Sequence, residues 1–231
     1  MTPHEIHIPL FPLPHCVLLP GAVLPLHVFE RRYRLMTDHV LEQLPGRRYI
    51  ATALLVEGDE SLSETAAPIH PVVCVGRMLE YSRLPDGRFN ILLAGQWRGR
   101  VINEDTSRPF RVARIQRMPP QVDSFTREAS HLVEALEHAL GDATRWGLVD
   151  QQLIDWVTKR SDSCRQLVDL LAYYVFPADE ADLKQAVLEE TDLRGRVQLV
   201  LERLEEMVED AQRSGRTQAP FRPWPPAGGE N

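Results

Sequence analysis

Apolar and polar residues alternate with a period of two on both sides of Pro85-Asp86-Gly87. Proline presets the backbone for a turn and glycine accepts the positive φ that closes it, so this tripeptide predicts a β-hairpin. The alternating apolar positions are Val73, Val75, Leu79 and Tyr81 on the first arm and Phe89, Ile91 and Leu93 on the second. We therefore expect two long paired strands over residues 72–103, around which the first half of the chain is organised.

Four more stretches of the first half have the pattern of strands, at residues 5–11, 22–29, 48–56 and 110–118. Pro25 favours a sheet edge or a bulge for the second, because proline has no N–H to donate to a neighbouring strand. The third is apolar throughout and is expected to be buried on both faces. Residues 30–44 have a helical period, and 57–68 are acidic and small, which is typical of a mobile loop. The apolar face of the helix is formed by Tyr33, Met36, Val40 and Leu44.

The second half has a helical period almost to its end, with helices expected over residues 125–145, 148–160, 162–175, 179–190 and 192–213. Ser124 is placed to cap the first of them. The last carries a heptad seam of Leu193, Val197, Val200, Leu204, Met207 and Ala211. Strands followed by helices predict an α+β fold. We expect a β subdomain over 1–121, a helical subdomain over 122–213 and a disordered Pro- and Gly-rich tail over 214–231.

Composition and charge limit the possible functions and cellular locations of the protein. The net charge of -7 disfavours a nucleic-acid binder, because phosphate contacts need a concentrated basic surface. Three widely spaced cysteines, Cys16, Cys74 and Cys164, indicate a reducing compartment without a disulfide framework. No apolar run is long enough to span a membrane, and the N-terminal residues lack the pattern of a signal peptide. We expect a cytoplasmic protein with no membrane partner.

Three parts of the chain resemble the N-terminal domain of Lon protease. The first is IPLFPLPHCVLLPGAVLPLHVFERRYRLM and the second is VGRMLEYSRLPDGRFNILLAGQWRGRV, in which Gly76, Asp86, Gly87, Gly95, Arg98 and Arg100 fall on the family's positions. The third is SDSCRQLVDLLAYYVFPADEADLKQAVLEETDLRGRVQLVLERL. The similarity extends over about residues 5–210. It implies a PUA-like pseudo-barrel of about six strands with one helix, followed by a helical bundle.

The sequence departs from Lon where Lon carries its chemistry. No G-x-x-x-x-G-K-[ST] phosphate loop occurs, and the only lysines, Lys159 and Lys184, lie inside predicted helices, so no Ser-Lys protease dyad is expected. The chain thus resembles the stand-alone Lon substrate-binding-domain proteins. This resemblance implies a non-enzymatic module that binds unfolded or degron-bearing polypeptides, as an adaptor or chaperone-like protein in protein quality control. A protease or chaperone is the partner it implies.

Two groups of residues are candidates for polypeptide contacts. Arg98 and Arg100 share one strand face, where they could clamp a carboxylate or a peptide carbonyl, or could be solvated or paired with Glu104 and Asp105. The second group is Phe29, Glu30, Arg32 and Tyr33, between a strand and a helix. There an aromatic ring and a guanidinium suit peptide recognition, whereas Glu30 is also explained by the helix dipole. We expect the polypeptide to bind where the two groups meet.

The remaining patterns favour structural roles. Asp86 and Gly87 are explained by turn chemistry. Gly76 and Gly95 are typical of a close backbone approach or a bend in a barrel strand. His4, His7 and His15 lie near Cys16 without the spacing of a zinc site, so no metal and no cofactor are expected. An RNA-binding module, by analogy with PUA-like folds, and an uncharacterised enzyme remain alternative functions.

Overall fold

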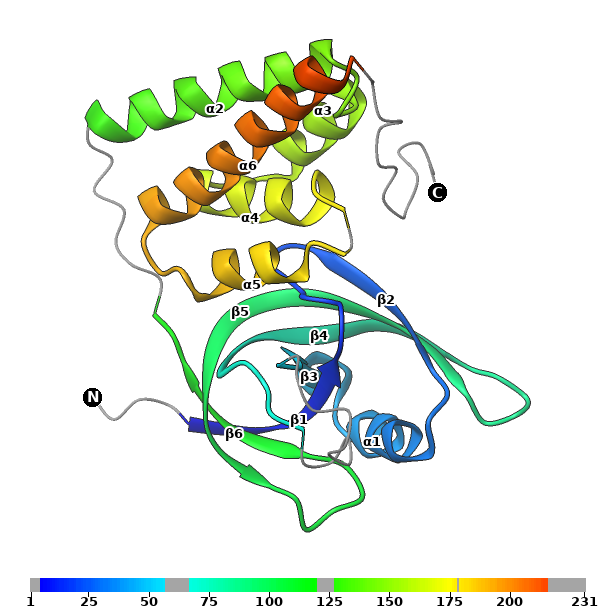
Figure 1. Cartoon of the computed structure of the whole chain (residues 1–231). Coiled ribbons are helices and arrows are strands. Elements are labelled where there is room, and N and C mark those ends of the chain that lie inside the picture. The colour runs from blue at the N-terminus through cyan, green and yellow to red at the C-terminus, as the bar shows by residue number, and fades with distance from the viewer. Residues whose placement is uncertain (1–4, 57–66, 120–126, 178, 216–231) are drawn as a thin grey trace. The chain divides into compact units, whose positions relative to one another are not determined.

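The computed structural model describes residues 5–56, 67–119, 127–177 and 179–215 (Figure 1). Contacts divide the chain into two compact units, residues 1–119 and 120–231, which we call the β unit and the helical unit. Most of the loop expected at 57–68, the cap at Ser124 and almost all of the tail expected at 214–231 lie outside the described residues.

The β unit contains six strands and one α-helix. The strands are β1 (Glu5–Leu13), β2 (Val23–Val28), β3 (Tyr49–Leu54), β4 (Val72–Arg83), β5 (Phe89–Asp105) and β6 (Val112–Arg117). Their order is β2-β5-β4-β3-β1-β6, and an additional β5–β6 pairing closes β1, β3, β4, β5 and β6 into a barrel. Among the described residues β2 pairs only with β5, so of the two alternatives that Pro25 indicated, an edge or a bulge, the edge is confirmed.

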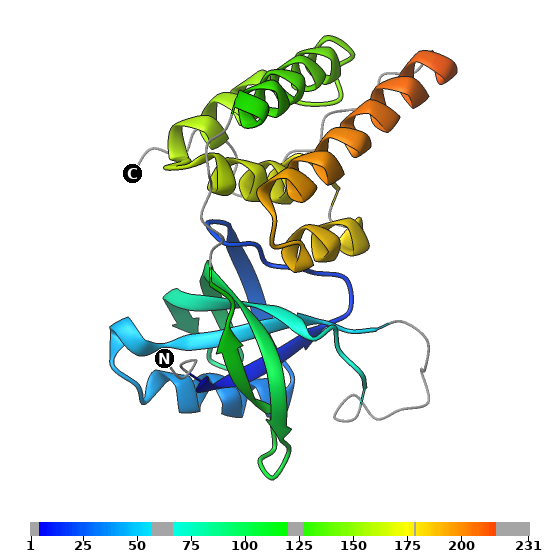
Figure 2. The same cartoon turned by 90° about the vertical axis from the view of Figure 1, so that its left-hand side faces the viewer.

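The long, curved β5 pairs with three of the other strands (Figure 1; Figure 2). One of its edges pairs with β4, while the other pairs first with β2, over residues 89–94, and then with β6, over residues 99–105. Gly95 lies at the changeover, where its N–H donates to Ala22 O and its carbonyl accepts from Gly21 N, both at 2.9 Å. A Cβ at Gly95 would overlap the carbonyl oxygen of Leu19, so the close approach expected there is present.

The hairpin between β4 and β5 is confirmed, but the inward face of β4 was predicted wrongly beyond its middle. Gly87 has φ +81° and closes the turn. Leu79 and Tyr81 are 44% and 48% exposed, because register shifts at Val75/Gly76 and Met78/Glu80 put Met78 into the core instead. A β-bulge adds one residue to a strand and reverses the face of everything that follows it.

Helix α1 (Arg31–Leu41) packs beside β1 and buries Tyr33, Met36 and Val40, as its period predicts. Leu44 was expected on the same face but is 69% exposed. The helix ends at Leu41, and a short 3₁₀ turn, η1 (Pro45–Arg47), follows, so Leu44 is no longer in helical register. All of β3 except Tyr49 is buried, which confirms the expected two-sided burial.

The helical unit consists of α2 (Arg127–Arg145), α3 (Gln151–Arg160), α4 (Cys164–Tyr174), α5 (Ala181–Glu189) and α6 (Leu193–Ser214). α6 packs on α2, α4 and α5. Gly147, with φ +70°, separates α2 from α3, and Asp150 and Ser163 cap α3 and α4 by accepting from backbone N–H groups. Within the described ranges, every helix is too short or too polar to span a lipid bilayer.

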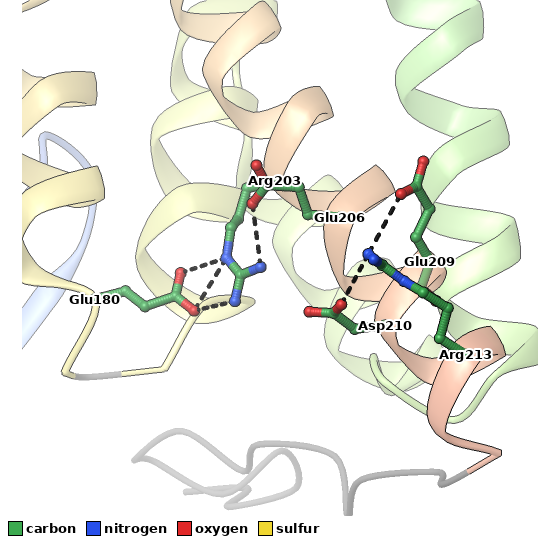
Figure 3. Close-up of polar contacts among 6 residues, drawn as sticks. All are labelled: Glu180, Arg203, Glu206, Glu209, Asp210 and Arg213. Atoms are coloured by element: carbon green, nitrogen blue, oxygen red, sulfur yellow. Dashed lines mark hydrogen bonds and ion pairs between the residues drawn. The ribbon is translucent and has the colours of Figure 1, made fainter.

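The buried face of α6 includes five of the six predicted seam residues, with Val208 rather than Met207 completing it. It also includes Arg196, whose Nη1 donates to Asp169 Oδ1 of α4 at 3.0 Å while both side chains are almost fully buried. The exposed face carries ion pairs instead (Figure 3). Arg203 binds both carboxylate oxygens of Glu180, before α5, and this contact raises the pKa of Arg203.

Candidate functional site

A pocket of about 700 Å³ opens at one end of the barrel, entirely within the β unit. It is lined by β1 on one side, by η1 and the start of β3 on the other, by the last turn of α1 and Gln43 just after it, and by one residue each from β5 and β6. The lining residues are Ile6, His7, Ile8, Pro9, His39, Val40, Gln43, Gly46, Arg47, Tyr49, Trp97 and Arg117.

The pocket exists because β1 and β3 separate. Their parallel pairing covers only Leu10–Leu13 of β1, beginning with Leu10 opposite Ala51. Residues 5–9 of β1 continue away from β3 and pair with β6. Pro9 stands at the point of separation and has no N–H to give to a neighbouring strand, which explains why the β1–β3 ladder stops there.

The lining combines apolar and cationic side chains. Ile8 belongs to the buried barrel core, and the half-buried Trp97 packs against the same core. Ile6 is 45% exposed at the mouth. The guanidinium of Arg117 lies 5.5 Å from the centre of the Trp97 ring, in the geometry of a cation–π contact. The lining contains two arginines and two histidines and neither aspartate nor glutamate. Such a pocket suits a ligand with an apolar part and a negative charge.

The strand–helix junction holds three of the predicted contact residues in internal interactions. Tyr33 is 6% exposed, its ring centre lies 4.2 Å from that of Phe11, and burial raises its pKa. Arg32 donates from Nε and Nη2 to the carboxylate of Glu30 at 3.0 and 2.7 Å and also lies over the Tyr33 ring. Glu30 occupies the N-cap position of α1 without a capping hydrogen bond from its side chain. Tyr33 therefore faces the core rather than a groove.

Phe29 differs from its neighbours, since it is 61% exposed and stacks only loosely on His27, with ring centres 6.3 Å apart. Arg98 is partly exposed and Arg100 exposed on β5. Glu104, one of their expected partners, binds Arg111 instead. Val28 pairs with Phe89 at the start of β5, so the two predicted groups are about nine residues, or roughly 30 Å of strand, apart. The structure does not bring them together.

The turn residues of the hairpin are held by local contacts. Asp86 accepts from the Arg88 backbone N–H at 3.0 Å and from Arg88 Nε at 2.6 Å, and these hydrogen bonds lower the pKa of Asp86 to about 2. Gly76 lies at one of the β4 register shifts, and a Cβ there would meet Leu18 Cδ2 at 3.0 Å. Gly76, Gly95 and the two turn residues thus have a structural explanation.

The contribution of Asp86 to stability is expected to depend on pH only under acidic conditions. Because its pKa is lowered from the ordinary value of 3.8 to about 2, the contribution is present above pH 3.8 and is lost as the pH falls through 2. A carboxyl-carbon NMR titration should give a midpoint near 2 in the native chain and one nearer the ordinary value in Arg88→Gln. A native midpoint close to 4 would contradict the contact.

The sequence did not point to the pocket. Trp97 has Gly95 and Gly99 two residues away in the same phase of β5, which is a weak signal of a cavity, but Arg47 and Arg117 are ordinary surface arginines until the fold places them at one pocket. Metal binding gains no support either. Within residues 5–56, 67–119, 127–177 and 179–215, no three histidine, cysteine, aspartate or glutamate side chains gather as metal ligands would.

Comparison with known proteins gives the family. The model of the ATP-dependent protease La (LON) substrate-binding domain matches residues 7–206. The chain belongs to the Lon substrate-binding domain family. Lon protease 2 of Sorangium cellulosum is 31% identical over 208 residues, which are 87% of this chain and 24% of that protein. Lon protease 2 of Myxococcus xanthus is 28% identical over 210 residues, 85% of this chain and 23% of that protein.

Solved structures show the same fold. The N-terminal domain of a Mycobacterium avium complex Lon protease matches with a TM-score of 0.65 at 17% identity and covers 87% of this chain and 99% of its own. A Lon N-terminal domain protein from Xanthomonas campestris matches with a TM-score of 0.57 at 23% identity, over 85% and 98%. The α+β prediction and the resemblance to the Lon N-terminal domain are confirmed. The chain spans about a quarter of the length of the curated relatives, and the match is to their substrate-binding domain.

Proposed function

We propose that this Lon-type domain is a non-catalytic module that binds unfolded or degron-bearing polypeptides at the barrel-end pocket and presents them to a protease or chaperone. Family membership supports the class of ligand. The observation that supports this location of the binding site is the pocket of about 700 Å³, in which exposed Ile6 and half-buried Trp97 offer apolar surface. Aromatic anchors of this kind contribute strongly to protein–protein binding.

Phe29, Arg98 and Arg100 remain proposed secondary contacts, because their side chains are at least partly exposed. We assign Glu30, Arg32 and Tyr33 to the support of the strand–helix junction, from which they hold α1 against the barrel. We place the module in the cytoplasm. Its three cysteines carry thiols rather than disulfides, which suits a reducing compartment.

The function is tested by fluorescence anisotropy of a labelled, permanently unfolded polypeptide titrated with the full chain. We expect binding at micromolar concentrations, with the native form of the same polypeptide binding at least tenfold more weakly. Single-stranded RNA titrated in parallel should not compete. Absence of binding to the unfolded polypeptide, or displacement of that polypeptide by RNA, would refute the proposal.

The site is tested by introducing one charge into the pocket. Ile6→Asp should weaken binding of the unfolded polypeptide at least tenfold, because it places a carboxylate at the apolar mouth. Leu79→Asp is the matched control, since Leu79 is also a strand residue of the β unit and is 44% exposed against 45% for Ile6. The control should bind within twofold of the native chain. Equal losses in the two variants would place the site elsewhere.

A further inference from the structure

The separation of β1 from β3 leaves one edge of β1 open beside the pocket. We propose that the bound polypeptide adds to this edge as an extended strand along residues 6–9, and that Arg47 and Arg117 hold a carboxylate of that polypeptide. The carboxylate belongs to an acidic side chain or to a C-terminus. The inference rests on the proposed function and names the form and chemistry of its ligand.

The direction of the backbone groups follows from one hydrogen bond. Leu10 N donates to Arg111 O at 2.9 Å, so the polar groups of Leu10 point towards β6. Successive residues of a strand direct their N–H and C=O groups to opposite sides. Ile8 and Ile6 therefore bond with β6, their partners in the antiparallel ladder, whereas His7 and Pro9 direct theirs to the other side.

That other side is the gap between β1 and β3. In the described part of the chain, β3 pairs with β1 only from Ala51 onwards, and the β1 segment 5–9 has β6 as its neighbour on the opposite edge. His7 offers an N–H and a carbonyl to the gap, whereas the Pro9 carbonyl is engaged by the Ala51 N–H in the first bridge of the β1–β3 ladder. The donor and acceptor of His7 form a short template for strand addition, a recurring mode of peptide recognition.

The side chains around this edge set the pattern of the ligand. Ile6 and Ile8 lie on the barrel-facing side of β1, and Val40 of α1 and Trp97 of β5 line the same pocket. An added strand has the same alternation as β1, so every second residue of the ligand points towards this apolar surface. We expect aliphatic or aromatic residues at those positions and polar residues between them.

Charge adds the second requirement. Arg47 and Arg117 are exposed, and neither forms an ion pair with an acidic side chain within the described residues. A further cation, Arg108, lies next to the pocket, because its Nη1 is 3.4 Å from Nε2 of the lining residue His39. Glu42 lies 3.6 Å from His39 Nδ1 but is not part of the lining. Arginine binds carboxylates through paired N–H groups, so a carboxylate is the complementary ligand group.

Synthetic octapeptides that alternate valine and threonine test the carboxylate and the added strand in the same anisotropy assay. The free-acid peptide, and an amidated peptide with one threonine replaced by aspartate, are compared with the plain C-terminal amide. We expect at least one of the two acidic peptides to bind the full chain at least fivefold more tightly than the plain amide. The ratio of the affinities of the free-acid peptide and the aspartate peptide distinguishes a C-terminal carboxylate from a side-chain carboxylate. Equal affinity of all three peptides would overturn the assignment of a carboxylate.

Strand addition is tested with two N-methylated sets of the tighter peptide, one methylated at the odd amides and one at the even amides. Only one edge of an added strand faces β1, so one set should lose at least tenfold in affinity and the other should keep its affinity. Equal behaviour of the two sets would overturn strand addition. If the native chain binds the unfolded polypeptide but binds the two methylated sets with equal affinity, this inference alone is refuted. If the chain does not bind the unfolded polypeptide at all, the proposed function is refuted as well.

The roles of the two arginines are tested by the double variant Arg47→Gln/Arg117→Gln. It should bind the acidic and amidated peptides with equal affinity while keeping its dependence on N-methylation. Arg31→Gln is the matched control, since Arg31 is an exposed arginine at the opposite end of α1 from the pocket. It should retain the fivefold preference. A preserved preference in the double variant would overturn the assignment.

Discussion

Asp169→Ala is expected to lower the free energy of unfolding of the helical unit by about 3–5 kcal/mol, the largest effect of any substitution considered for this chain. Asp169 accepts a hydrogen bond from Arg196 Nη1 at 3.0 Å, and the two side chains are only 2% and 1% exposed. Removal of the carboxylate takes away the acceptor that lies 3.0 Å from a buried guanidinium. Urea unfolding of the full chain, followed by circular dichroism at 222 nm, measures the loss.

Two further variants separate the ion pair from its burial. Arg196→Met/Asp169→Leu removes both charges and should regain most of the lost stability, because apolar residues of similar size often replace a buried pair without cost. Asp210→Ala removes an exposed partner of Arg213 on α6 and should cost no more than about 0.5 kcal/mol. A loss below 1 kcal/mol for Asp169→Ala, or a double variant as unstable as the single one, would contradict this view of the pair.

Gly95→Ala is expected to destabilise the β unit by about 3 kcal/mol. The new methyl group would overlap the backbone oxygen of Leu19, where residues 19–22 cross β5 through two hydrogen bonds at 2.9 Å. A backbone obstacle cannot turn away as a flexible side chain can. Gly46→Ala is the control, because a Cβ at Gly46 meets nothing within 4 Å, and its stability should stay within about 0.5 kcal/mol. Equal effects of the two substitutions in urea unfolding would contradict the crossing.

Local sequence was enough to predict the elements of this fold. The Pro85-Asp86-Gly87 turn, the edge proline Pro25 and the apolar stretch of β3 each carry their information in neighbouring residues, and all three predictions hold. The buried face of the second half of β4 could not be predicted from local sequence, because a bulge depends on how two strands are paired and not on either strand alone. Arg196 was missed for a related reason. A charged residue on an apolar helix face is recognised as buried only when its partner on another helix is known.

The candidate site was much less predictable. Sequence directed attention to Phe29, Tyr33 and the Arg98/Arg100 face, residues that carry chemistry and match the family pattern. The pocket depends instead on the departure of β1 from β3 at Pro9, and on helix and strand ends that are far apart in the chain. No local pattern contains that separation. The sequence contains four tryptophans and many arginines, and only the closed barrel selects Trp97, Arg47 and Arg117 from among them.

Hydrogen–deuterium exchange of the full chain, with and without saturating unfolded polypeptide, tests polypeptide binding at the barrel-end pocket most directly. We predict slower exchange in fragments that cover residues 6–9 and 46–49, the two sides of the pocket. Exchange in the hairpin turn, residues 84–88, and in α6 should stay unchanged. Slower exchange confined to the hairpin turn or to the helical unit, or no change anywhere despite saturation, would contradict binding at this pocket.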